Sequence, residues 1–272
     1  MNRIVALEEA RDAGVFGSKA VGLGEAMRNG LPVPPGVALS GSIVDDVAAG
    51  DEGAIEEVSK WVGPLGGPLA VRSSAVDEDG ALASFAGQHV TLLNVPSCNE
   101  VSDALAEIWW SANSDSAISY RKRVGLFTRP NIAVVVQALL SSDTAGVMFT
   151  VNPVAGADER VIEASWGLGE AVVSGLVIPD HFRVDRRGQV LERRPGLKKV
   201  AIRGGQGGGT VTENVPFELV ERLCLDDSRL EALGRLADLC ERVYGPARDI
   251  EWAFAGGALY LLQCRAITRA GA

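Results

Sequence analysis

The stretch RDIEWAFAGGALYLLQCRAIT, residues 248–268, has the pattern of an antiparallel β-hairpin. Two runs of apolar, aromatic and β-branched residues flank the pair Gly256-Gly257, and a glycine pair between such runs predicts a tight turn. A second hairpin is predicted over residues 181–194, with its turn at Arg187-Gly188. The sequence therefore predicts antiparallel sheet in the later part of the chain.

Polar side chains alternate with apolar ones along the 248–268 hairpin. Because successive side chains of a strand point to opposite faces, Asp249 and Glu251 are expected to share one face, and Gln263 and Arg265 to share a face of the second strand. Mg²⁺ prefers carboxylate, amide and phosphate oxygens, and a guanidinium suits a phosphate. The same pattern is consistent with a solvated hairpin face that holds a surface ion pair.

Helices are expected to accompany these strands. Residues 17–30, GSKAVGLGEAMRNG, indicate a helix with Ser18 near its N-cap and Gly30 at its end. Further helices are expected over residues 99–125 and from Asp226 or Asp227 to about residue 245. Strands are expected within residues 68–74, 131–140, 145–153 and 159–167. Mixed helices and strands with late antiparallel hairpins predict the α+β class.

Composition excludes several classes of function. The 272 residues are 47% hydrophobic and 22% charged, which is typical of a globular protein. A net charge of −9 argues against nucleic acid as a partner. The sequence contains no run of about 18 apolar residues, so no membrane span is expected. The first residues, MNRIVALEEARDAG, lack the basic-then-apolar pattern of a signal peptide, so the expected location is the cytoplasm.

A second chemically unusual stretch is VRSSAVDEDGALASFAGQHVTLLNV, residues 71–95. It begins as a buried strand and continues with an arginine, two serines, three carboxylates and a loop of small residues. Lys19 follows Ser18 at the start of a predicted helix, where unpaired backbone N–H groups and the helix dipole favour anions. A lone lysine at such a position is more often simply solvated.

Five segments in a fixed order resemble one known family, the ATP-binding domain of phosphoenolpyruvate synthase, pyruvate phosphate dikinase and rifampin phosphotransferase. The resemblance extends over nearly the whole chain, and five linked segments make it specific. The segments are SKAVGLGEAMRNGLPVPPGVALS, AVRSSAVDEDGALASFAGQHVTLLNV, VVVQALLSSDTAGVMFTVNPVAG, ASWGLGEAVVSGLVIPD and DIEWAFAGGALYLLQCRAIT.

The resemblance implies an ATP-grasp fold, in which two α+β subdomains close on the nucleotide. The expected subdomains are residues 1–95 and 96–272, with approximate boundaries and with ATP in the cleft between them. Family enzymes also carry a phosphohistidine domain and a substrate domain, and nothing in this sequence resembles either. The chain is therefore expected to be one part of a split enzyme, an excised domain or a small stand-alone phosphotransferase.

The resemblance also assigns roles to individual residues. Those expected to act in catalysis by holding phosphate charge are Lys19, Arg72 and Arg265. Gly87 and Thr91 match a loop that closes over the phosphates, where a Cβ would obstruct the backbone. Gln137 lies where the family contacts the adenine side of ATP. Residues expected to hold the metal are Glu251 and Gln263, with Asp249 assisting, and the implied cofactors are ATP and Mg²⁺.

The implied activity is cleavage of ATP to AMP, with transfer of a phosphoryl group to a histidine on a partner chain or to a small substrate. One alternative is an ATP-grasp ligase that activates a carboxylate and releases ADP. Another is a nucleotide-binding subunit without chemistry of its own. His89 and His181 resemble no phosphorylated histidine and are interpreted as structural, and RGGQGGGT, residues 203–210, is interpreted as a flexible connection.

Overall fold

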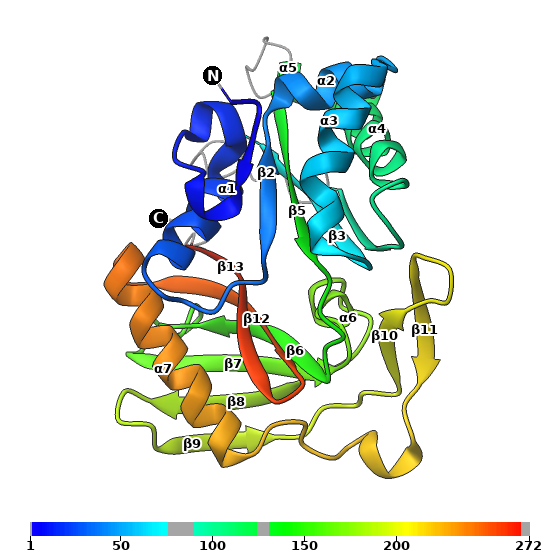
Figure 1. The fold of residues 1–272 in the computed structure, drawn as a ribbon. Helices are drawn as coiled ribbons and strands as arrows, with labels where there is room; N and C mark the ends of the chain where they lie inside the picture. The colour runs from blue at the N-terminus through cyan, green and yellow to red at the C-terminus, as the bar shows by residue number, and fades with distance from the viewer. Residues whose placement is uncertain (1, 76–89, 124–130, 268–272) are drawn as a thin grey trace. The chain divides into compact units, whose positions relative to one another are not determined.

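The computed structural model describes residues 2–75, 90–123 and 131–267 (Figure 1). Helices and antiparallel sheets alternate along the chain, so the predicted α+β class is confirmed. No helix among these residues is long and apolar enough to cross a membrane.

The chain divides into two compact units. The first comprises Met1–Glu25, Pro34–Leu139 and Gly205–Gly209, and the second comprises Ala26–Val33, Leu140–Gly204 and Thr210–Ala272. The sequence places a boundary near residue 95, whereas residues 96–139 belong to the first unit. The physical reason is strand pairing, because β5 (Ile132–Ala138) pairs with β2 (Gly36–Leu39) on one side and with β3 (Leu69–Ala75) on the other.

An antiparallel five-stranded sheet organises the first unit, in the order β1-β2-β5-β3-β4. β1 is Ile4–Ala6 and β4 is Thr91–Val95. One face of the sheet packs against three helices, α2 (Gly41–Ala48), α3 (Glu52–Val62) and α4 (Val101–Ala112) (Figure 1). The buried side chains that they share form the core of the unit, for example Val44, Val58 and Leu105 above Val71 and Val136.

Shorter elements complete the first unit. They are the 3₁₀ turns η1 (Leu7–Glu9) and η2 (Gly63–Leu65) and the helix α5 (Asp115–Arg123). The helical stretch predicted over 99–125 is therefore divided into two helices, because α4 ends at Ala112 and its C-cap residue Asn113 has a φ of −101° and a ψ of 11°, which are not helical. The Ser114 hydroxyl then accepts a hydrogen bond from the N–H of Ala117, at 3.3 Å, at the start of α5.

A six-stranded antiparallel sheet organises the second unit, in the order β13-β12-β6-β7-β8-β9. Its strands are β6 (Thr144–Phe149), β7 (Glu159–Trp166), β8 (Asp180–Asp185), β9 (Val190–Arg194), β12 (Arg248–Ala255) and β13 (Ala258–Ala266). Both predicted hairpins are confirmed: β12 and β13 turn at Gly256 and Gly257, and β8 and β9 turn around Gly188.

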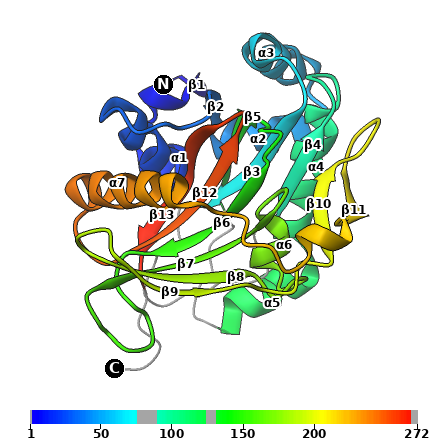
Figure 2. The ribbon, with the colours of Figure 1, turned by 90° about the horizontal axis from the view of Figure 1, so that it is seen from below.

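The helix α7 (Asp227–Tyr244) lies along one face of this sheet (Figure 2). Leu230, Leu233 and Cys240 of the helix pack with Ile250 and Trp252 of β12 in the core of the second unit. The remaining elements of the second unit are α6 (Glu170–Val173), η3 (Phe217–Leu219) and the paired strands β10 (Val200–Gly204) and β11 (Thr210–Asn214). The helix α1 (Ala13–Arg28) begins in the first unit and ends in the second.

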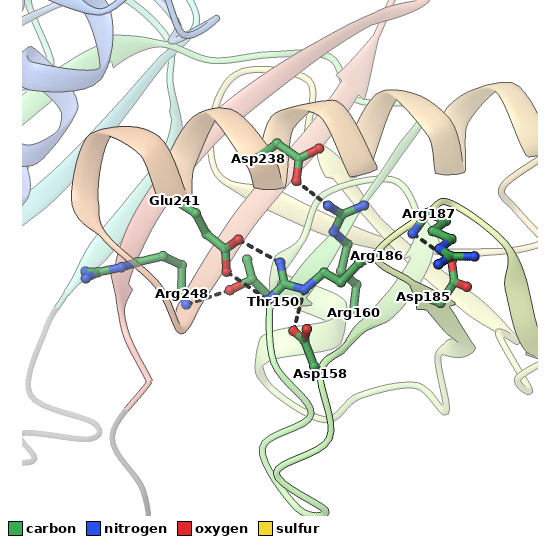
Figure 3. A network of polar contacts seen from close by, with 9 residues as sticks. All are labelled: Thr150, Asp158, Arg160, Asp185, Arg186, Arg187, Asp238, Glu241 and Arg248. Carbon is green, nitrogen blue, oxygen red and sulfur yellow. Dashed lines mark hydrogen bonds and ion pairs between the residues drawn. The ribbon is translucent and has the colours of Figure 1, made fainter.

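Ion pairs fasten α7 to the sheet beside the start of β12 (Figure 3). Arg186, just after β8, donates to Glu241 of α7 at 2.6 Å and to Asp158 at 2.5 Å. The N–H of Arg248 donates to the hydroxyl of Thr150 at 2.9 Å, so these contacts hold the backbone one residue before Asp249.

Candidate functional site

The first unit's sheet carries polar side chains on the face opposite α2, α3 and α4. Leu69 and Val71 of β3 enter the core, so Arg72, between Val71 and Ser73, points to the opposite face. Arg72 lies opposite Thr91 of β4 and opposite Val135 of β5.

Gln137 shares this face. It follows Val135 by two positions on β5, which places it diagonally across from Arg72 on the neighbouring strand. Its side chain is only 3% exposed, and its amide nitrogen donates to the carbonyl oxygen of Pro34 at 2.9 Å. That hydrogen bond fixes the orientation of the amide group.

Lys19 is held against the end of β3 by a kink in α1. Gly17 has a φ of 76° there, and a Cβ at this position would lie 1.9 Å from the carbonyl oxygen of Ser74. The Ser74 hydroxyl donates to the carbonyl oxygen of Phe16 at 2.8 Å and accepts from the N–H of Ala20 at 3.1 Å. Ser74 thus ties the helix to the strand and satisfies one N–H of its first turn.

The ammonium group of Lys19 donates to the carbonyl oxygen of Ser73 at 2.7 Å, and the residue is only 9% exposed. Lys19 is therefore not the fully solvated surface lysine of the simpler interpretation. The structure brings Lys19, Arg72, Thr91 and Gln137 together around β3, and we call these four residues the first group. Gly87, predicted to belong with them, lies outside the described residues.

The hairpin β12–β13 positions the second group, which is Asp249, Glu251, Gln263 and Arg265. Glu251 lies opposite Gln263, and Asp249 lies opposite Arg265. Ile250 belongs to the core beneath α7, which leaves the second group on the other face of the sheet. The alternation predicted from the sequence is therefore observed.

Charge is unevenly balanced within the second group. The Arg265 guanidinium lies 2.8 Å from a carboxylate oxygen of Asp249, and the side chains are 53% and 11% exposed. Burial nevertheless raises the pKa of Asp249, with a further contribution from the charge of Glu251, against the opposing effect of Arg265. Ionised Asp249 is thus incompletely compensated by the protein alone.

Comparison with known proteins assigns the chain to a family. The family model described as pyruvate phosphate dikinase, AMP/ATP-binding domain, matches residues 39–272. The chain belongs to this family. The predicted resemblance is confirmed, and the predicted binding of ATP is supported by the family's description.

Relatives of this ATP-binding domain have longer chains. It is 34% identical over 307 residues to a probable phosphoenolpyruvate synthase of Methanothermobacter thermautotrophicus, which covers 96% of this chain and 45% of that protein. It is 44% identical over 202 residues to a probable phosphoenolpyruvate synthase of Archaeoglobus fulgidus, covering 74% and 27%. It is 37% identical over 201 residues to rifampicin phosphotransferase of Bacillus subtilis, covering 73% and 23%. The domain thus spans less than half the length of these relatives.

Two further polar residues share a face of the second unit's sheet with Glu251, and the sequence interpretation assigned neither of them to the site. Glu163 of β7 and His181 of β8 lie in the same row of strand pairs as Glu251, on the same face, with Val147 of β6 between Glu251 and Glu163. A ring nitrogen of His181 lies 3.9 Å from a carboxylate oxygen of Glu163. An acidic residue inside the apolar run RVIEASW was the available signal for Glu163.

Proposed function

We propose that this ATP-binding domain binds ATP with Mg²⁺ through both groups of side chains and is the nucleotide module of a phosphotransferase with an ATP-grasp fold. The observation that carries the proposal is the face of the β12–β13 hairpin, where two carboxylates, an amide and a guanidinium stand in register. An isolated surface ion pair would not need Glu251 and Gln263 opposite each other beside it.

The second group is better suited to Mg²⁺ that is also bound by phosphates than to a metal bound by protein side chains alone. No cluster of three or more His, Cys, Asp or Glu side chains that could hold a metal occurs among the described residues. Mg²⁺ is typically held by one or two carboxylates together with substrate phosphates and water, and Glu251, Gln263 and Asp249 match that need. The raised pKa of Asp249 agrees, because a nearby cation would offset the uncompensated charge. When bound, Mg²⁺ neutralises phosphate charge and orients the phosphates.

Cationic side chains of the chain itself supply the remaining charge. Lys19, Arg72 and Arg265 hold phosphate oxygens, and an arginine does so with two parallel N–H donors. Thr91 contributes a hydroxyl beside Arg72, and Gln137 binds toward the adenine. Catalysis by such a set consists of positioning the phosphates and stabilising their charge in the transition state.

The proposed reaction cleaves ATP to AMP and passes a phosphoryl group to a histidine on a separate chain or to a small substrate in the cytoplasm. The similarity to a probable phosphoenolpyruvate synthase and to a rifampicin phosphotransferase supports phosphoryl transfer. A carboxylate-activating ligase would release ADP instead, and a subunit that only binds the nucleotide would release neither product.

Product analysis distinguishes these functions. The chain is incubated with Mg²⁺ and ATP labelled at the β-phosphate, with and without a separate phosphohistidine-domain chain, and the products are separated. Formation of AMP, with the label in a product that no longer contains adenosine, supports the proposal. Formation of ADP would refute the proposal and favour the carboxylate-activating ligase. An Arg72→Met variant serves as the negative control, since it removes a proposed phosphate ligand.

A further inference from the structure

Asn94 is the unusual residue of the strand β4. Its backbone φ is 61°, in the left-handed region that few residues other than glycine and asparagine adopt, and it is only 6% exposed. Leu93 lies opposite Ala70 and Val95 lies opposite Leu69, so Asn94 is the additional residue of a β-bulge.

The bulge determines which face of the sheet the side chains of Val95 and Thr91 occupy. Val95 enters the core beneath the helices, and Thr91 stands opposite Arg72 on the other face. Thr91 and Val95 are four positions apart, so a regular strand would place both side chains on the same face, and the bulge at Asn94 places them on opposite faces. The position of Thr91 beside Arg72 therefore depends on the backbone conformation of Asn94.

Asn94 also holds a distant part of the chain. Its side-chain amide donates to the carbonyl oxygens of Gly205 and Gly209, at 2.8 Å and 2.6 Å. Its own carbonyl oxygen accepts from the N–H of Gly209 at 3.0 Å. The segment Gly205–Gly209, which belongs to the first unit, is thus bound at both ends and is not the flexible connection expected from its composition.

The glycines of this segment fit the arrangement. Gly207, Gly208 and Gly209 have φ values of 85°, 117° and 65°, and Gly205 donates to Gly209 at 2.8 Å across the turn. A Cβ on Gly208 would lie 2.8 Å from Cγ of Pro96, whereas one on Gly207 would meet nothing within 4 Å. A side chain at Gly208 would therefore press against Pro96, just after β4, whereas one at Gly207 would enter open space.

We propose that Asn94 is a positioning residue for the nucleotide site, and that Gly205–Gly209 is the intramolecular ligand that holds it in place. We call this arrangement the Asn94 clamp. It stabilises the bulge, and the bulge presents Thr91 beside Arg72. The inference rests on the proposed function, because Thr91 and Arg72 bind phosphate only if the chain binds ATP.

Substitutions at Asn94 separate the clamp from the bulge. Asn94→Gly keeps a left-handed backbone at no steric cost but removes the amide donors. Asn94→Asp keeps the shape and accepts hydrogen bonds but donates none to the two carbonyl groups. Both variants are expected to bind Mg²⁺ and ATP about tenfold more weakly in calorimetry, equal to ~1.4 kcal/mol. Gln206→Ala, in the same segment but exposed, is expected to bind like the wild type.

A second measurement reports the clamp itself. Proteinase K, with cut sites mapped by mass spectrometry, should cleave within 205–209 faster in Asn94→Gly than in the wild type. Since coupling between two events is reciprocal, saturating ATP with Mg²⁺ should slow that cleavage. If Asn94 had only a structural role, Asn94→Gly would change the cleavage rate, but ATP with Mg²⁺ would not slow cleavage within 205–209. That result would overturn the proposal.

The glycine side of the clamp gives an independent test if the Asn94 variants do not fold. Gly208→Ala and Gly207→Ala both place an alanine at a positive φ, but only Gly208→Ala collides with Pro96. Gly208→Ala is expected to weaken ATP binding and Gly207→Ala to weaken it much less. Equal affinities in the wild type, Asn94→Gly and Gly208→Ala would refute the clamp. Absence of ATP binding in the wild type would instead refute the proposed function, while protease cleavage would still test the clamp.

Discussion

Replacing Glu251 by glutamine should separate ligand binding from stability. The side chain keeps its shape and loses one negative charge, and Asp249 lies on the same face two positions away. Two residues along a strand span ~6.8 Å. At that distance two like charges repel by about 2.4 kcal/mol at an effective dielectric constant of about 20. Salt and solvent at this partly exposed face reduce the repulsion to about 1 kcal/mol.

The melting temperature of the ligand-free Glu251→Gln protein should therefore stay constant or rise by about 2 °C. Cleavage of ATP should fall about 100-fold or more, because each ~1.4 kcal/mol of lost transition-state stabilisation costs a factor of ten. Scanning calorimetry with and without Mg²⁺ and ATP, together with an assay for AMP, measures both effects on one pair of proteins.

Glu192→Gln is the matched control. Glu192 lies on β9 of the same sheet, forms an ion pair with Arg183 at 3.3 Å, and its side chain is 37% exposed. The substitution therefore removes the same charge at a place away from the β12–β13 hairpin. This variant should keep normal ATP cleavage. If Glu251→Gln also cleaves ATP normally and is stabilised by Mg²⁺ and ATP like the wild type, Glu251 does not belong to the site.

Three further predictions concern the framework. Gly17→Ala should lower the free energy of unfolding by about 3 kcal/mol, because the new Cβ would collide with Ser74. Gly22 lies in the same helix with open space around it, so Gly22→Ala should raise the free energy of unfolding by about 0.5 kcal/mol. Urea denaturation measures both changes. Lys198→Met should cost about 3 kcal/mol in the same assay, because it leaves the fully buried carboxylate of Asp180 without its cation, and an effect below about 1 kcal/mol would contradict this. Hydrogen bonds from Arg183, and from Asn152, lower the pKa of Glu159 from 4.5. Ionised Glu159 therefore stabilises the folded protein above pH 4.5, and this contribution is lost as the pH falls through the lowered pKa. Acid should destabilise the wild type more than Glu159→Gln, and parallel profiles of stability against pH would refute the assignment.

The parts of the fold that depend on local pattern could be predicted. The β12–β13 hairpin follows from alternating side chains around a glycine pair, and the same alternation placed Asp249 and Glu251 on one face. The helix around Lys19 was also predictable, although the kink at Gly17 that seats it depends on contact with Ser74.

The parts that depend on distant pairing could not be predicted. The position of β5 between β2 and β3 moves the limit of the first unit past residue 95, and no local pattern encodes that order. Glu163 reaches the row of Glu251 only through the register of β6, β7 and β12. Asn94 contacts glycines more than 100 residues away, so composition alone made that segment appear flexible.

Titration calorimetry of the wild-type chain with ATP, in the presence and absence of Mg²⁺, tests the central claim most directly. The proposed function predicts saturable binding of ATP with Mg²⁺ present and much weaker binding once the metal is chelated. No detectable heat with Mg²⁺ at about 1 mM ATP, where even an interaction of −4.1 kcal/mol half-fills the site, would contradict the account.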